Sequence, residues 1–312
     1  MALEWSERVD QVLGGDLTAA LAYLTPAGGA VATAVAPLGL RDRTRGELTF
    51  TTSLGFGRKL DRIRRDPKVA LLYHAREHGF HEGDELVLVQ GTARIVEHPD
   101  QAYLDNVVGP AAGAFMGPPR TGVFWDRWLQ EYYADRVPVH VGVERVALWP
   151  SLEGAGDPEV EGHPPPAAWP PPQAPPRNGA GPRVDVDRAL KRAEGIRHAV
   201  LAWKGGDGYP VVAPVQLADA SARGIAIRAE RALPPGGRRA GLLVHDYNAQ
   251  LIGLRVRQFT GWYEDGLYAP HTETGFRAPA NKTLLLLANG LMAKRGLRKA
   301  RKQQAAAASA TA

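Results

Sequence analysis

The chain contains no cysteine among its 312 residues. Disulfides and thiolate metal sites are therefore excluded, and a secreted, disulfide-stapled fold is not expected. Long apolar runs are also absent: runs such as Leu284 to Ala288 are far shorter than the roughly 20 residues that span a bilayer. The N-terminus lacks the basic-then-apolar order of a signal peptide. We therefore expect a cytoplasmic protein with no membrane span.

The chain also lacks a strong excess of positive or negative charge. The net charge is +5, and a good part of it lies in the basic run from Lys294 to Lys302, so no specific nucleic-acid partner is expected. Paired carboxylates, a nucleophile–base arrangement and a Walker-type loop are not evident, and no catalytic residue is assigned. His74, His78 and His81 follow a strand and enclose Gly79. They read as a loop rather than a helical metal motif, so no metal site is predicted.

Proline, by contrast, is abundant and concentrated. Ten of the 25 prolines lie between Asp157 and Pro182, where they remove backbone donors and favour an extended polyproline conformation that cannot join a sheet or helix interior. We predict a domain at 1–150, a Pro-rich linker at 151–183, a second domain with a C-terminal helix at 184–302, and a disordered tail at 303–312.

The first half has the pattern of many short strands with one inserted helix. Apolar and β-branched runs bounded by turn residues predict strands, and a basic stretch ending before Pro67 predicts the helix. Gly91 inside a strand suggests a bulge. The expected strands are 21–25, 30–37, 48–52, 68–74, 85–96 and 137–149, with the helix at 57–66. This order favours a small closed β-barrel with flanking helices over a sandwich.

The second half repeats short pieces of the first in the same order. Leu71 to His74 matches Leu242 to His245, and Gln90-Gly91-Thr92 resembles Gln258-Phe259-Thr260. Val35-Ala36-Pro37 likewise matches Val212-Ala213-Pro214. Matches in one order at a nearly constant offset predict a duplication. Two tandem barrels joined by the Pro-rich segment would form a covalent pseudo-dimer, either monomeric or paired again as a homodimer.

The segment with the clearest chemistry is 48–59. A strand ends in the hydroxyl residues Thr51, Thr52 and Ser53, a glycine-containing loop follows, and a helix begins with Arg58 and Lys59. A helix N-terminus favours an anion, and Arg and Lys both suit a phosphate. The residues thus indicate a phosphate-monoester site on a barrel rim, although a solvated basic helix face is an equally ordinary reading.

This segment, followed by Arg64-Arg65-Asp66-Pro67-Lys68-Val69-Ala70 and a Gln-Gly-Thr-Ala strand, resembles the pyridoxamine-phosphate oxidase and deazaflavin-dependent reductase superfamily over residues 20–97. The resemblance implies a split β-barrel. It also implies the following cofactor contacts: phosphate binding by Thr51, Thr52, Arg58 and Lys59, and ring contacts from Thr33, Val35 and Gln90. From the residues alone, Ser53 is a further candidate for the phosphate oxygens. Gly57 departs from the small hydroxyl residues frequent at that place in the flavin oxidases, and the pyridoxine-binding pattern is not evident, so vitamin B6 synthesis is not predicted.

The resemblance implies FMN or the deazaflavin coenzyme F420, with hydride transfer to or from a small organic substrate. Alternatives are a non-catalytic flavin- or heme-binding protein (a carrier or sensor) and a scaffold without cofactor. Recurrence of His74 as His245 is compatible with a heme contact or with two ordinary strand-end histidines. The second copy of the phosphate segment, 228–239, replaces the threonine pair with Ala229 and Glu230, and Glu230 would repel an anion.

Overall fold

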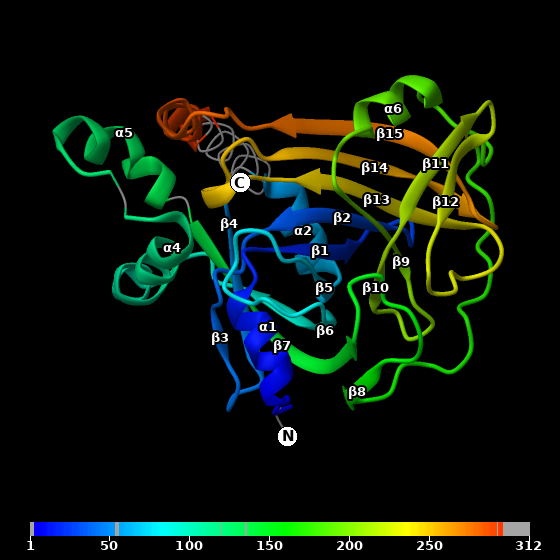
Figure 1. The fold of residues 1–312 in the computed structure, drawn as a ribbon, viewed down its shortest axis with the longest axis horizontal. Helices are drawn as coiled ribbons and strands as arrows, with labels where there is room; N and C mark the ends of the chain where they lie inside the picture. The colour runs from blue at the N-terminus through cyan, green and yellow to red at the C-terminus, as the bar shows by residue number, and fades with distance from the viewer. Residues whose placement is uncertain (1–2, 54–55, 119, 135, 292, 296–312) are drawn as a thin grey trace, which may run out of the picture.

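The computed structural model describes residues 3–53, 56–118, 120–134, 136–291 and 293–295. The predicted tail at 303–312 and the basic end of the predicted C-terminal helix lie outside these residues. Most of the described chain forms two antiparallel β-sheets with a few flanking helices (Figure 1). Among the described residues, no helix has the length and apolar character to cross a membrane.

The first sheet has the strand order β2-β1-β5-β6-β7-β4-β3, and β8 pairs with β7. Its strands are β1 (Thr18–Leu24), β2 (Ala30–Val35), β3 (Arg41–Asp42), β4 (Glu47–Ser53), β5 (Lys68–Ala75), β6 (Leu86–Ile95), β7 (Arg136–Trp149) and β8 (Glu159–Gly162). The helices of this half are α1 (Glu7–Gly15), α2 (Gly57–Arg65), α3 (Gln101–Tyr103), the π-helical η2 (Leu104–Val108), α4 (Gly109–Met116) and α5 (Val123–Ala134).

The second sheet has the order β10-β9-β13-β14-β15-β12-β11. Its elements are α6 (Val186–Ala193), β9 (His198–Lys204), β10 (Pro210–Pro214), β11 (Gln216–Ser221), β12 (Gly224–Arg228), β13 (Arg238–Asp246), the 3₁₀ turn η3 (Ala249–Leu251), β14 (Arg255–Glu264) and β15 (Leu267–Arg277). Residues 282–291 and 293–295 are also helical. The two sheets have the same strand order: each strand of the second sheet takes the position that the strand with a number eight lower takes in the first sheet, so that β9 corresponds to β1 and β15 to β7. Two split-barrel units in tandem account for this arrangement.

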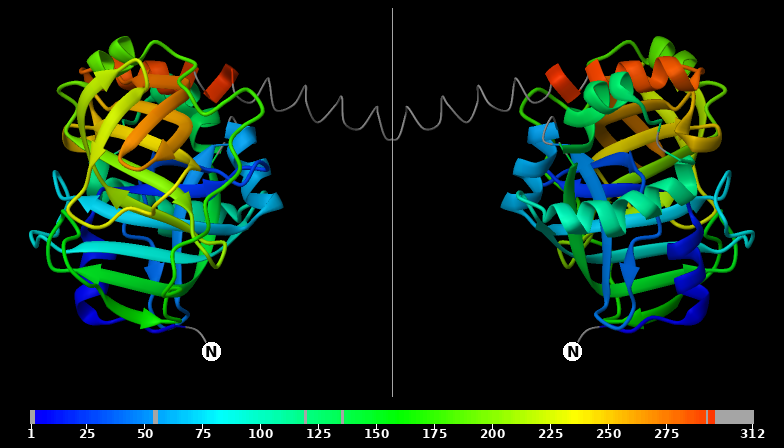
Figure 2. Two further views of the ribbon diagram at one scale, coloured as in Figure 1. Left: turned by 90° about the vertical axis from the view of Figure 1, so that its right-hand side faces the viewer. Right: turned by 90° about the vertical axis from the view of Figure 1, so that its left-hand side faces the viewer.

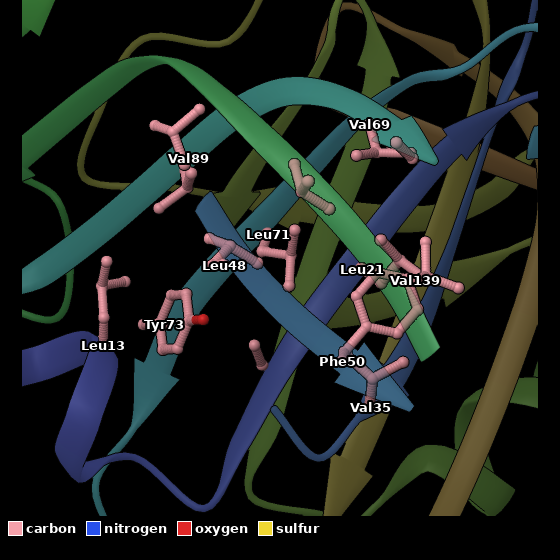
Figure 3. Close-up of a cluster of buried hydrophobic side chains, with 14 of the residues drawn as sticks. Leu13, Leu21, Val35, Leu48, Phe50, Val69, Leu71, Tyr73, Val89 and Val139 are labelled. Atoms are coloured by element: carbon pink, nitrogen blue, oxygen red, sulfur yellow. The ribbon is translucent and has the colours of Figure 1, made fainter. Parts of the chain in front are cut away.

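The first barrel closes around a core that its alternating strands supply. Leu48 and Phe50 on β4 and Val139 on β7 point into this core, together with Val35 from β2 (Figure 3). Side chains two residues apart share one face of a strand, which is why these sequences read as apolar–polar alternation. Helix α1 begins at the N-cap Ser6 and buries residues at helical spacing against the same core: Val9, Val12 and Leu13.

The two sheets lie against each other (Figure 2). A second apolar cluster, rich in alanine, fills their contact. Ala20, Ala22, Ala30 and Ala32 of the first sheet meet residues of the second sheet, which are Val200, Ala202, Val212 and Leu243. Small side chains let the backbones approach closely. A Cβ at Gly241 would lie 2.7 Å from the carbonyl oxygen of Ala30, so this position needs glycine.

The bulge predicted at Gly91 is confirmed, because the β6–β7 register shifts between Gln90 and Gly91. A Cβ on Gly91 would lie 2.2 Å from the carbonyl oxygen of Gly142. The second sheet repeats the device at Gly261, where the β14–β15 register also shifts.

The prediction that the Pro-rich segment cannot join a sheet is wrong for its first residues. Strand β8 pairs with β7 and ends before the first proline triplet. The rest has no regular structure, but it is not a free spacer. Gln173 donates to the carbonyl oxygen of Gly28 at 2.8 Å and accepts from the backbone N–H of Arg239 at 2.9 Å. It thereby ties both halves together.

Candidate functional site

The candidate phosphate site lies where β4 ends and α2 begins, beside the first residue of β7. Ser53 pairs in register with Arg136, and Thr51 with Pro138. The Nη1 of Arg136 donates to the Thr51 hydroxyl at 3.4 Å. Arg136 was not identified from the sequence, because only the long-range pairing of β4 with β7 brings it here.

Two positive groups approach each other at this strand end. The Lys59 side chain is half-buried, and its ammonium lies 4.9 Å above the Phe56 ring. Desolvation of the ammonium and the nearby charge of Arg136 lower the pKa of Lys59 to about 8. Among the described residues, no carboxylate forms an ion pair with Lys59. Most arginines of the first half, by contrast, form an ion pair with a carboxylate. The Lys59 ammonium, partly desolvated and beside a second positive group, marks a place where an anion would bind favourably.

The threonine pair is split between two faces of β4. Thr52 follows Leu48 and Phe50 on the side of the barrel core, while Thr51 faces Arg136. Both are buried, and within the described residues the Thr52 hydroxyl oxygen has no hydrogen-bond partner. A buried hydroxyl without a partner costs free energy unless a ligand or water satisfies it. Thr52 therefore suits an oxygen-rich ligand at the strand end.

The N-terminus of helix α2 has no side-chain cap. Its N-cap residue is Phe56, which makes no side-chain capping bond, and no acidic residue stands in the first turn. Free N–H groups and the helix dipole at this end favour a bound anion. Arg58 is exposed beside it. Ser53 is half-buried at the last position of β4.

Thr33 and Val35 lie on β2, between the two sheets. Val35 packs into the first core, and Thr33 alternates onto the same face, half-buried. The other face of β2 meets the second sheet, where Gln258 donates to the carbonyl oxygen of Ala32. Val35 is thus a core residue here, and Thr33 is the more accessible of the two predicted ring contacts.

Gln90 is placed far from this site. It is buried, donates to the carbonyl oxygen of Pro210 at 2.6 Å, and accepts from Arg145 at 2.7 Å. Its partner Arg145 and the site residue Arg136 stand nine residues apart on β7, roughly 30 Å of extended strand. Gln90 therefore serves the contact between the two barrels, as its counterpart Gln258 does from the other side.

The second copy presents a different surface at the corresponding place. A cavity of about 760 Å³ is lined by residues of both charge signs, among them Arg228, Glu230, Arg231 and Asp265. Arg231 covers the Trp149 ring, with its guanidinium carbon 4.8 Å from the ring centroid. The opposing charges give this cavity no clear preference for a phosphate.

No protein-family model matches the chain, and no curated protein does. Solved structures resemble it. A conserved hypothetical protein of Mycobacterium tuberculosis aligns with 48% of this chain and 87% of its own at 23% identity and a TM-score of 0.36. A protein of Clostridium acetobutylicum related to general stress protein 26, of the pyridoxinephosphate oxidase family, aligns with 49% of this chain and 90% of its own at 13% identity and a TM-score of 0.33.

A pyridoxamine 5'-phosphate oxidase-related, FMN-binding protein of Nostoc punctiforme aligns with 64% of this chain and 87% of its own at 11% identity and a TM-score of 0.30.

Proposed function

We propose that the chain binds a flavin-type cofactor, FMN or coenzyme F420, by its phosphate at the end of β4. The observation that carries the proposal is the partly desolvated Lys59 ammonium beside Arg136, with no carboxylate to neutralise it among the described residues. A phosphate would neutralise the Lys59 ammonium. Thr51, on the face of β4 that meets Arg136, would contribute its hydroxyl, and Arg58 would stand at the rim.

The reaction class we propose is hydride transfer to or from a small organic substrate. The flavin ring supplies that chemistry when bound, and the protein contributes position and electrostatics. Lys59, Arg136 and the start of α2 would fix the phosphate end. Thr33, on the face of β2 that points away from the second sheet, would border the ring. No side chain of the chain is required as nucleophile.

The test is a fluorescence titration of the full chain with FMN, with riboflavin and with coenzyme F420. Riboflavin lacks the phosphate, so phosphate anchoring predicts that FMN binds more tightly by at least about tenfold, the effect of one charge-assisted contact. Lys59→Ala should remove most of this preference. Arg65→Ala removes a similar charge from the exposed last turn of α2 and should leave it unchanged.

If FMN and riboflavin bind equally, the phosphate site is wrong. If FMN binds but no reductant or substrate changes its absorption, the carrier or sensor reading replaces the enzyme. A reductase screen is worthwhile only once FMN has been shown to bind more tightly than riboflavin.

A further inference from the structure

The second barrel has a cavity of its own at the end of β12, the strand that corresponds to β4 of the first barrel. Loop residues 229–235 and the β14–β15 turn around Asp265 and Gly266 form its walls, and its volume is about 760 Å³. Sites for small molecules have volumes in this range, with apolar walls and a few polar groups that orient the ligand. The cavity shares no residue with the proposed phosphate site.

Arg231 differs from the other charged residues of the lining. Arg228, Glu230 and Asp265 are exposed to solvent, whereas Arg231 is half-buried. Its guanidinium carbon lies 4.8 Å from the centroid of the Trp149 ring, which belongs to β7 of the first barrel. The Nη1 atom of Arg231 is buried, and within the described part of the chain it has no hydrogen-bond partner. Burial lowers the pKa of Arg231, and no neighbouring carboxylate offsets this effect among the described residues.

An arginine held over an aromatic ring suits a carboxylate ligand. The cation–π contact is made by the charge, so it leaves the N–H donors of the guanidinium available. These donors form a rigid fork that matches the two oxygens of a carboxylate. Because Arg231 is partly desolvated, its attraction for an anion is stronger than that of an arginine in bulk water. A ligand oxygen would also satisfy a buried donor that otherwise costs free energy.

The rest of the lining offers apolar surface. Ile227 and Tyr263 belong to the apolar core of the second barrel, and Ala229 and Leu233 pack against this core. All four residues line the cavity. Walls of this kind favour a ligand with a hydrocarbon or aromatic body over a small inorganic ion.

Hydrogen bonds hold the walls of the cavity together. Asp265 Oδ1 accepts from the backbone N–H of Gly236 at 2.9 Å, which links the β14–β15 turn to the loop after β12. The Tyr263 hydroxyl accepts from the backbone N–H of Gly266 at 3.2 Å, which closes the turn itself. A site whose walls are already in place loses little conformational entropy when a ligand binds. One oxygen of Asp265 thus has a structural role in the wall.

We propose that this cavity binds an organic monocarboxylate, with the carboxylate on Arg231 and an apolar body along Ile227 and Leu233. Glu230 and Asp265 belong to the same lining, and their negative charges would repel a second charge on the ligand, so a phosphate dianion is disfavoured. A neutral analogue would leave the Arg231 donors unpaired and should also bind more weakly. The ligand class therefore differs from the flavin phosphate of the first barrel.

The experiment is a ligand-detected NMR titration of the full chain with phenylacetate, decanoate and the neutral phenylacetamide. At least one of the two carboxylates should bind saturably, and phenylacetate should bind at least about tenfold more tightly than phenylacetamide, the effect of one charge-assisted contact. Arg231→Ala should remove this preference. Arg223→Ala removes an exposed arginine from the β11–β12 turn of the same barrel and should leave it unchanged.

A second pair of variants keeps the test decisive if Arg231→Ala does not fold. Ala232 is exposed and lines the cavity, so Ala232→Asp places a negative charge there and should weaken carboxylate binding by at least about threefold. Ala232→Asn has the same shape without the charge and should bind as the wild type does.

Three results would overturn the proposal: neither carboxylate binds, phenylacetamide binds as tightly as phenylacetate, or Ala232→Asp binds as tightly as Ala232→Asn. FMN and inorganic phosphate should not displace the bound carboxylate. Failure of this site is therefore distinguishable from failure of the flavin site, since each has its own ligand and its own variants.

Discussion

At the scale of single residues, charge and burial identify the candidate site more sharply than the residue types do. Many arginines of the first barrel have carboxylate partners, such as Arg41 with Asp10 at 2.7 Å and Arg64 with Glu97 at 2.8 Å. Lys59 has none among the described residues, and the charge of Arg136 lies close to it. This asymmetry supports the proposed anion site over a solvated basic helix face, the two readings that the sequence left open.

The lowered pKa of Lys59 predicts a pH effect on flavin binding. Below pH 8 the ammonium is charged and attracts the phosphate, whereas above pH 8 it loses its proton. We expect the FMN dissociation constant to rise with pH above about 8, by up to about tenfold per pH unit. The rise should level off once the pH exceeds the higher pKa that Lys59 has in the FMN complex. Titrations between pH 7 and 9.5 measure this, and the riboflavin dissociation constant should stay flat over the same range.

Lys59 should also react selectively with amine reagents. At pH 8 about half of its side chains are uncharged, whereas a free lysine side chain, with a reference pKa of about 10.4, is almost fully protonated at this pH. Brief acylation followed by peptide mapping should modify Lys59 ahead of the exposed lysines, and FMN should protect it. Equal labelling of all lysines would contradict the assigned environment.

Gln90 makes two buried hydrogen bonds at the contact between the barrels, and their loss should destabilise the protein. Gln90→Ala removes the acceptor of a buried Arg145 N–H and the donor to Pro210. We expect a loss of about 1–3 kcal/mol in the free energy of unfolding, the cost of a buried group left without its partner. Gln101→Ala, which removes an exposed bond to Asp105, should change it by less than about 0.5 kcal/mol. Denaturant unfolding at equilibrium compares the two.

At the scale of elements, the close approach of β13 to β2 decides how the barrels fit. A Cβ on Gly241 would lie 2.7 Å from the carbonyl oxygen of Ala30 and 3.0 Å from the N–H nitrogen of Ala32. Both contacts are with backbone, so the strands must move apart to accept it. Alternating alanines on β1 and β2 make the same approach possible along the rest of the contact.

Gly241→Ala should therefore destabilise the protein by about 1–3 kcal/mol through overpacking. Gly113→Ala is the matched control, because Gly113 lies in helix α4 and its Cβ would meet no heavy atom within 4 Å. That change should be neutral or stabilise by up to about 1 kcal/mol. Thermal and denaturant unfolding of the two variants test the difference, and similar losses in both would show that the β13–β2 contact is not tight.

At the scale of the whole molecule, the alanine-rich contact and the Gln173 bridge make the two barrels one structural unit. Their facing surfaces are buried and apolar, unlike the polar contacts between domains that move independently. Hydrogen exchange should then show the same opening free energy for the central strands β5 and β13, since both are released only by global unfolding. Two clearly different values would mean that each barrel unfolds by itself.

The sequence by itself determined the elements and their kind. Alternating apolar residues located the strands, Pro67 ended α2, and Gly91 marked a bulge, because these features act within a few residues of the chain. Local spacing also brought Thr51, Thr52, Arg58 and Lys59 into one segment. The short matched pieces indicated a second unit with the same strand order.

Only the tertiary structure decided which residues meet. Arg136 joins Thr51 through the β4–β7 register, Gln90 bonds to Pro210 and Arg145 at the contact between the barrels, and His74 meets His245 rather than solvent. These contacts link residues between 55 and 171 positions apart. Composition and periodicity report the local conformation of a chain and the face that it buries, but not the partner it buries that face against.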